Sequence, residues 1–109
     1  MTSPRPGDLW IADITYTTGT ASKRRPVLVL WTDADDVIVA LVTSAEPRTR
    51  TDVHLADWKR ARLKVPSTVR LLRLDSLEVA LLVRRVGRVS RRDAAALVSA
   101  WQRHVVLRL

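Results

Sequence analysis

Three consecutive cations stand directly before a proline and an apolar run: Lys23, Arg24, Arg25, Pro26 and residues 27–30. Proline cannot donate a ladder hydrogen bond and holds the residue before it extended. The sequence therefore predicts a strand that starts at Pro26, with Arg25 in an extended conformation directly before it. A guanidinium fixed in this way suits a phosphate, because its planar donors match phosphate oxygens in pairs. Taken alone, the stretch also fits an ordinary charged loop that leads into a core strand.

Other residue types that catalyse reactions are scarce. The chain has no cysteine, which excludes disulfides and thiolate metal sites. His54 and His104 are far apart and form no ligand-spaced motif. We therefore expect neither a metal site nor a cofactor, although a carboxylate-bound magnesium remains compatible with the sequence. His54 alternates with Val53 and Leu55, so it is expected to face solvent.

Length and charge limit the class of protein. A chain of 109 residues predicts one domain, 1–109, with residues 1–5 as a loose tail. The net charge of +8 suggests an anionic partner, either nucleic acid or an acidic protein segment, although GC-rich coding DNA also enriches arginine. No apolar stretch is long enough to span a membrane, and the N-terminus lacks the apolar core of a signal peptide. We expect a soluble cytoplasmic protein.

Short apolar or alternating runs between turn residues predict a mainly β domain. Expected strands are 9–14, 26–32, 37–42, 52–55, 67–74 and 79–89. The second and third form a hairpin around a turn at 33–36. Loops are expected at 15–22 and 45–50, a turn at 75–78, a helical turn at 57–61, and a bulge or bend at Gly87.

One substantial helix is predicted after the strands. Ser90 is the expected N-cap, and Asp93 stands three residues on, in a capping-box position. Helical spacing then predicts one apolar stripe, formed by Ala94, Leu97, Val98, Trp101 and Val105. Several short strands followed by one helix indicate a small twisted barrel.

Six landmarks in order resemble the MazF/PemK family of bacterial toxins over about residues 6–105. They are Pro-Gly-Asp-Leu-Trp-Ile-Ala-Asp at 6–13, Lys-Arg-Arg-Pro-Val-Leu-Val-Leu at 23–30, Val-Ala-Leu-Val-Thr-Ser at 39–44, residues 52–58, Ser-Thr-Val-Arg at 67–70 and Val-Gly-Arg-Val-Ser at 86–90. The resemblance implies an SH3-like barrel of the CcdB/MazF/PemK kind, a homodimer and an acidic antitoxin partner. It also implies metal-independent, sequence-selective cleavage of single-stranded RNA such as mRNA.

The resemblance further implies that Arg25 and Thr43 carry the chemistry. The 2′-OH would attack its neighbouring phosphate, leaving a cyclic phosphate and a 5′-OH. A fixed guanidinium would stabilise the charge on the phosphorane, and a hydroxyl would orient the phosphate. Apart from the resemblance, Thr43 is an ordinary residue at the end of a strand. Further RNA-binding candidates are Lys23, Arg24, Ser44, Arg48, Arg70 and Trp31; Trp31 alternatively suits a dimer interface.

The chain departs from the family pattern ahead of Arg25. Many members have Pro-x-x-Gly-x-Glu there, whereas residues 16–22 read Tyr-Thr-Thr-Gly-Thr-Ala-Ser, closer to a PemK-like subgroup. One branch has Arg-x-Asp where Arg70-Leu71-Leu72 stands, and no general base is identified. Three hypotheses therefore stay open: an endoribonuclease toxin, a catalytically weak member that binds only RNA or antitoxin, and a CcdB-like inhibitor of a protein target.

Overall fold

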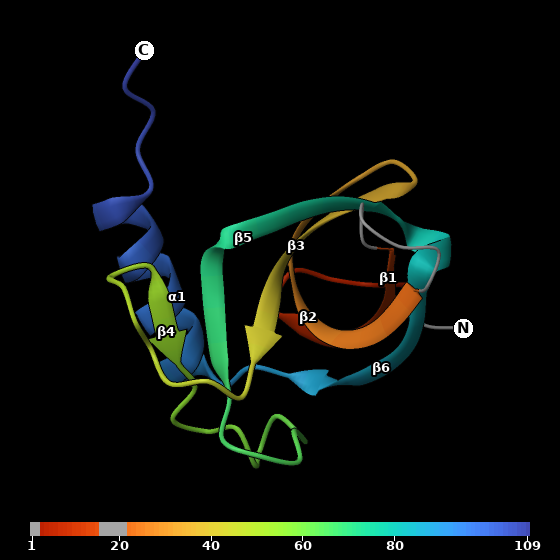
Figure 1. Cartoon of the computed structure of the whole chain (residues 1–109), viewed down its shortest axis with the longest axis horizontal. Coiled ribbons are helices and arrows are strands. Elements are labelled where there is room, and N and C mark those ends of the chain that lie inside the picture. Colours follow the sequence, from red (N-terminus) through yellow and green to blue (C-terminus); the bar gives the residue numbers. More distant parts are fainter. Residues whose placement is uncertain (1–2, 16–21) are drawn as a thin grey trace.

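The computed structural model describes residues 3–15 and 22–109 as one curled antiparallel sheet with a C-terminal helix (Figure 1). In chain order the elements are β1 (Asp8–Thr15), β2 (Ser22–Asp33), β3 (Asp36–Thr43), β4 (Asp52–His54), β5 (Thr68–Glu78), the 3₁₀ turn η1 (Val79–Leu81), β6 (Leu82–Arg88) and α1 (Arg91–His104). The 6-stranded sheet has the order β4-β5-β3-β2-β1-β6. In this described part no ladder joins β4 to β6, so the sheet is not closed. The predicted class, mainly β with a C-terminal helix, is confirmed.

The β2–β3 hairpin explains the two unbroken apolar runs of the sequence. Its strands meet at a tight turn, where Asp33 pairs with Asp36. Successive residues then point into two separate core clusters: Leu28, for example, packs in one cluster and Val29 in the other. Both faces of the hairpin are buried because the sheet curls over it, and strands covered on both faces do not need alternating polarity.

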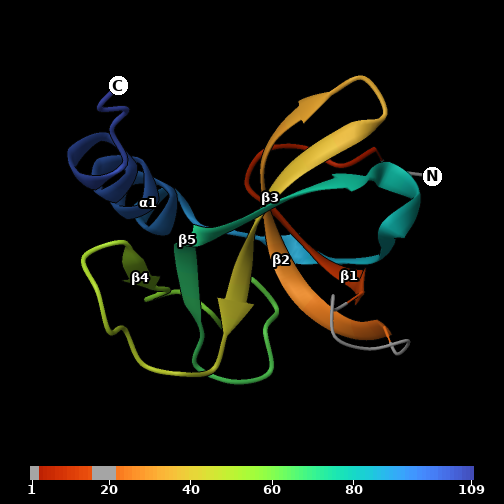
Figure 2. The ribbon, with the colours of Figure 1, turned by 45° about the horizontal axis from the view of Figure 1, so that its top comes forward.

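Strand β5 is longer than predicted, and the turn expected at 75–78 is wrong. The strand continues to Glu78 and pairs there with Asp36 of β3. Its register shifts between Ala40 and Leu41 of β3, and β5 bends sharply at this place (Figure 2). Residues 72–76 are all exposed. Asp75 and Ser76, residue types that are typical of a turn, therefore lie in an exposed part of the strand.

The strand that carries Arg25 also starts earlier than predicted. β2 begins at Ser22, and Pro26 lies inside it, paired with Ile11 of β1. The ladder from β2 to β3 begins only at Val27, so at Pro26 the strand has a paired neighbour on one side. A residue without an N–H is tolerated at such an edge. The predicted loop 15–22 falls largely on residues 16–21, which lie outside the described residues.

Helix α1 begins where the sequence predicts, with the Ser90 hydroxyl accepting a hydrogen bond from the N–H of Asp93 at 3.1 Å. The helix lies against β4 in both views (Figures 1 and 2). Leu97 is buried, as predicted for the apolar stripe. Val98 is 54% exposed, so the prediction that Val98 belongs to this stripe is wrong. In the described part of the chain no helix is long and apolar enough to cross a membrane.

Gly87 of β6 is a point of very close backbone approach. The register of β1 and β6 shifts between Leu9, opposite Gly87, and Trp10, which confirms the predicted irregularity. A Cβ atom at Gly87 would overlap the backbone carbonyl of Ala61. Only glycine lets the segment after β4 lie directly on β6.

Candidate active site

A groove of about 380 Å³ opens where β2, β3 and β6 meet the loop before β5. Arg25 lies in it because β2 holds the residue in register with Ala12 of β1. Thr43 lies in it because β3 ends there, in register with Thr68 of β5. We call this the Arg25 groove; it is lined by Ile11, Arg25, Pro26, Val42, Thr43, Ser44, Arg62, Leu63, Lys64, Val65, Ser67, Arg84 and Val86.

Four cations line the Arg25 groove: Arg25, Arg62, Lys64 and Arg84. The lining includes no carboxylate among the residues that the structure describes. A phosphodiester is the anion that guanidinium groups match best, because their planar donors bind phosphate oxygens in pairs. The geometry therefore favours binding of a phosphate.

Hydroxyl groups at the groove differ in how their hydrogen bonds are used. The Thr43 Oγ1 atom accepts from the N–H of Ala45 at 3.2 Å, so it keeps its own proton for donation. The Ser67 hydroxyl instead donates to the carbonyl of Val65 at 2.8 Å. Thr43 is thus oriented by its own backbone and can donate to a phosphate oxygen, whereas the Ser67 proton is already engaged.

Strand β6 carries three arginines, of which one lines the groove and two contact a buried carboxylate. Arg84 pairs in register with Ile11 and reaches the groove. Its neighbour Arg85 contacts the buried carboxylate of Asp8 at 3.4 Å, and Arg88 contacts the same oxygen at 3.1 Å. Burial raises the pKa of Asp8, but the N–H of Arg5 and the two guanidinium groups outweigh burial and lower the pKa below its ordinary 3.8.

Two cations, Arg62 and Lys64, reach the groove on the segment 56–65. The N–H of Ala61 donates to the carbonyl of Asp57 at 3.0 Å, which confirms the predicted helical turn. Arg62 has a φ of 69°, a left-handed conformation that costs energy for a residue with a side chain. Contacts elsewhere must therefore hold the segment in place.

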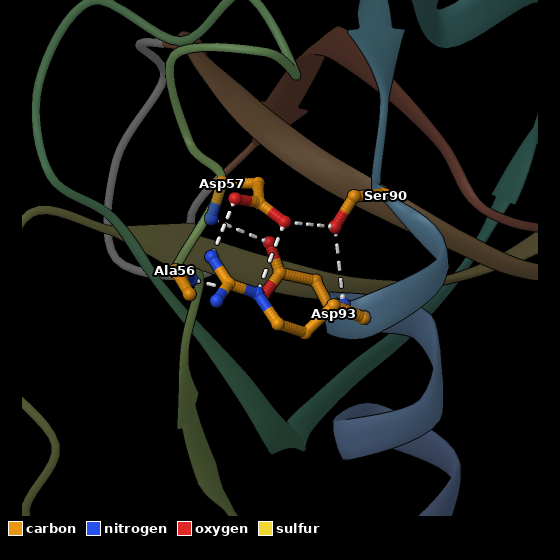
Figure 3. Close-up of polar contacts among 5 residues, drawn as sticks. Ala56, Asp57, Ser90 and Asp93 are labelled. Atoms are coloured by element: carbon orange, nitrogen blue, oxygen red, sulfur yellow. Dashed lines mark hydrogen bonds and ion pairs between the residues drawn. The ribbon is translucent and has the colours of Figure 1, made fainter.

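The start of α1 provides these contacts (Figure 3). The buried Asp93 carboxylate accepts from the N–H groups of Ala56 at 2.9 Å and Asp57 at 2.8 Å. Ser90 donates to the Asp57 carboxylate at 2.6 Å, and Arg92 donates to it at 2.6 Å. We call these five residues the Asp93 clasp. Asp93 holds the predicted position three residues after the N-cap, and its N–H donates to the Ser90 hydroxyl, but its carboxylate binds the segment after β4.

The Asp57 carboxylate makes the clasp sensitive to acid. The Arg92 guanidinium and the Ser90 hydroxyl hold the pKa of Asp57 below its ordinary 3.8. The native state therefore keeps Asp57 ionised to lower pH than the unfolded chain does. Its contribution to stability is complete above pH 3.8 and is lost as the pH falls below that value toward the native pKa.

We expect Arg92→Ala to lower the urea midpoint of unfolding at neutral pH and to change it much less at a second, acidic pH well below 3.8, where Asp57 becomes protonated. Arg91→Ala, at the exposed neighbouring position, is the control and should leave the midpoint nearly unchanged at both values. An equal loss at both pH values for Arg92→Ala would contradict an ionic contribution from Asp57.

The structure brings together only some of the residues predicted to act on RNA. Arg25, Thr43 and Ser44 line one groove. The other predicted residues do not line it: Lys23, Arg24, Arg48, Arg70 and Trp31.

Two of these five form ion pairs outside the groove. Arg24 contacts Asp13 at 3.3 Å, and Arg70 contacts the nearly buried Asp52 at 3.5 Å. Lys23 and Arg48 are exposed. Trp31 lies edge-on to Trp101, with ring centroids 6.3 Å apart, beside a separate apolar groove of about 260 Å³.

Sequence reasoning missed three of the four groove cations: Arg62, Lys64 and Arg84. The signals were weak, namely the basic run around the helical turn and the arginines that interrupt the last predicted strand. In the described part of the chain no group of three His, Cys, Asp or Glu side chains could hold a metal ion.

Comparisons with known proteins agree with this fold. A family model described as "PemK-like, MazF-like toxin of type II toxin-antitoxin system" matches residues 5–105. No curated protein matches the sequence significantly.

Solved structures with the same fold share little sequence with the chain. A mycobacterial endoribonuclease in complex with its cognate antitoxin is 18% identical over 97% of this chain and 98% of its own, with a TM-score of 0.78. The Mycobacterium tuberculosis toxin MazF-mt6 is 24% identical over 92% and 99% of the two chains, with a TM-score of 0.69. A chain of the MazE-MazF structure from Deinococcus radiodurans is 23% identical over 94% and 93%, with a TM-score of 0.71. At identities this low, the structural similarity shows a common fold and nothing more.

Proposed function

Because the chain belongs to the PemK-like, MazF-like family of type II toxin–antitoxin toxins, we propose that it is an endoribonuclease that cleaves single-stranded RNA without a metal ion. The observation that carries this proposal is the meeting of Arg25 and Thr43 in one groove with three further cations. These two residues are 18 positions apart in sequence, and the pairing of β2 with β3 in the hairpin brings them together.

The chemistry that suits this groove is transesterification within RNA. The ribose 2′-oxygen attacks the adjacent phosphorus, the bond to the 5′-oxygen breaks, and a 2′,3′-cyclic phosphate and a 5′-OH result. The 2′-OH proton passes to solvent, and the leaving oxygen takes a proton from solvent. Negative charge accumulates on the phosphorane oxygens, where the Arg25 guanidinium and the Thr43 hydroxyl would donate hydrogen bonds. The donor set supports independence from metal, because no groove-lining residue among those described is a carboxylate or a histidine.

Partners follow from charge and exposed apolar surface. The net charge of +8 suits both RNA and an acidic antitoxin. Trp31 and Val98 line the separate apolar groove of about 260 Å³ together with Trp101. Their side chains are 45% and 54% exposed, as is common for residues that contact another chain. We propose an acidic antitoxin and a homodimer as the assemblies, with mRNA in the cytoplasm as the substrate.

Incubation of the purified protein with a long single-stranded RNA in EDTA tests the proposed activity. We expect cuts at a recurring short motif, with cyclic phosphate and 5′-OH ends. A folded protein that binds RNA without cutting it would instead support the catalytically weak family member. A protein that neither binds nor cleaves RNA but inhibits a protein target would support the CcdB-like alternative.

A further inference from the structure

A second concave surface adjoins the Arg25 groove and has a different chemical character. It is a hollow of about 460 Å³ and shares Ser44 and Val65 with the groove. We call it the His54 hollow; its lining is Ser44, Ala45, Glu46, Pro47, His54, Val65, Pro66 and Thr68. Because two residues belong to both walls, a ligand in the groove can continue into the hollow.

Strand register places His54 on the same side of the sheet as Thr43. Both residues pair with Thr68 of β5, which lies between them. Directly paired residues point to the same face of a sheet, so the Cα atoms of Thr43 and His54 are two strand spacings apart, about 10 Å. Their neighbours Val42 and Val53 turn the other way, into or against the core cluster. The His54 ring thus stands on the same face as the proposed reacting phosphate, about one nucleotide away.

Charge separates the two surfaces. Among the residues that the structure describes, the Arg25 groove is lined by four cations and no carboxylate, whereas the His54 hollow is lined by Glu46 and by neither arginine nor lysine. The side chains of Glu46 and His54 have no hydrogen-bond or ion-pair partner among residues 3–15 and 22–109. A carboxylate repels a phosphate, and two prolines and a valine offer apolar walls. The hollow therefore suits a flat, polar-edged ring rather than an anion.

We propose that the His54 hollow is a nucleobase subsite that continues the Arg25 groove, a proposal that rests on the RNA cleavage proposed above. A nucleotide whose phosphate lies at Arg25 and Thr43 places its base against His54. The imidazole stacks on the base, as aromatic side chains do with unstacked RNA bases. The Glu46 carboxylate accepts a hydrogen bond from the exocyclic amino group of adenine, cytosine or guanine. Uracil has no such group and is disfavoured at this position.

The test is an RNA library randomised around the cut, with the ends of the products sequenced after cleavage by the wild-type chain and by variants. For the wild type we expect uracil to be depleted at one of the two nucleotides that flank the cut. Glu46→Ala should remove that depletion while cleavage continues. Glu78→Ala changes the other glutamate of the chain, which is exposed in β5, and should keep the wild-type profile.

His54 is tested by separating kcat from KM on one cleaved oligonucleotide. We expect His54→Ala to raise KM by at least about fivefold, as loss of a base stack does, with kcat retained. His54→Phe should restore KM, because phenylalanine stacks but transfers no proton. His104→Ala, at the exposed end of α1, should behave as wild type.

Three results would overturn the proposal. An unchanged cleavage profile for Glu46→Ala would remove the amino-group contact. A loss of kcat in His54→Ala that His54→Phe does not rescue would assign His54 to proton transfer instead of stacking. Failure of the wild-type chain to cut any RNA would refute the proposed activity, and the subsite with it, and this outcome is distinguishable because it appears before any variant is made.

Discussion

Arg25→Ala should lower the rate of RNA cleavage by about 100- to 1000-fold, the usual effect of removing one donor that stabilises a charged transition state. Arg25 lies inside a strand paired to β1, so its guanidinium is placed by backbone that the substitution does not alter. Single-turnover cleavage of one oligonucleotide measures the loss. Circular dichroism and the melting temperature should stay close to those of the wild type.

Two variants make this experiment specific. Arg25→Lys keeps the charge but loses the paired planar donors, so it should recover only part of the rate. Arg24→Ala removes the adjacent cation, which contacts Asp13 outside the groove, and should cut nearly as the wild type does. An Arg25→Ala protein that cuts at the wild-type rate would refute the site, whereas equal losses for Arg24→Ala and Arg25→Ala would point to general charge instead of a placed donor.

Asp93→Ala should lower the free energy of unfolding by about 3 kcal/mol or more, since hydrogen bonds to a charged group contribute roughly 1.5–3 kcal/mol each. The substitution leaves the N–H groups of Ala56 and Asp57 without their acceptor. For a chain of this size the corresponding fall in melting temperature is about 12 °C. Urea unfolding and thermal melting measure the two quantities.

The same substitution should also weaken RNA binding, because the Asp93 clasp holds the segment that carries Arg62 and Lys64. Asp93→Asn keeps one acceptor oxygen and should lose less stability than Asp93→Ala. Asp75→Ala, at an exposed position in β5, should stay within about 0.5 kcal/mol of the wild type. If Asp93→Ala is as stable as Asp75→Ala, the clasp does not hold the segment.

Features set by neighbouring residues could be predicted from the sequence. The β2–β3 hairpin follows from two apolar runs around a cluster of aspartates, and the start of α1 follows from Ser90. Each needs only residues a few positions apart. The prediction of a turn at 75–78 is wrong because β5 is held there by its pairing with β3. This is a non-local contact that local residue types do not encode.

The groove was predictable only in part for the same reason. Arg25 and Thr43 could be named because the resemblance to the MazF/PemK family assigns the chemistry to these positions; apart from it, Thr43 is an ordinary residue at the end of a strand. Arg62, Lys64 and Arg84 join them through the Asp93 clasp and through the β1–β6 register, which link segments far apart in sequence. The carboxylate of Asp93 reads locally as a helix cap, and its true partners, 36 and 37 residues earlier, are visible only in the folded chain.

Gly87 has a consequence for genetics. A selection for cells that survive expression of a toxic chain would collect substitutions at Arg25, but it should collect them at Gly87 as well. Any side chain there would push the Ala61 backbone away and move the wall of the groove, although Gly87 itself does not line the groove. Survivors would therefore divide into two phenotypes. Those at Arg25 would accumulate as folded, inactive protein, and those at Gly87 would be poorly folded and scarce in the cell.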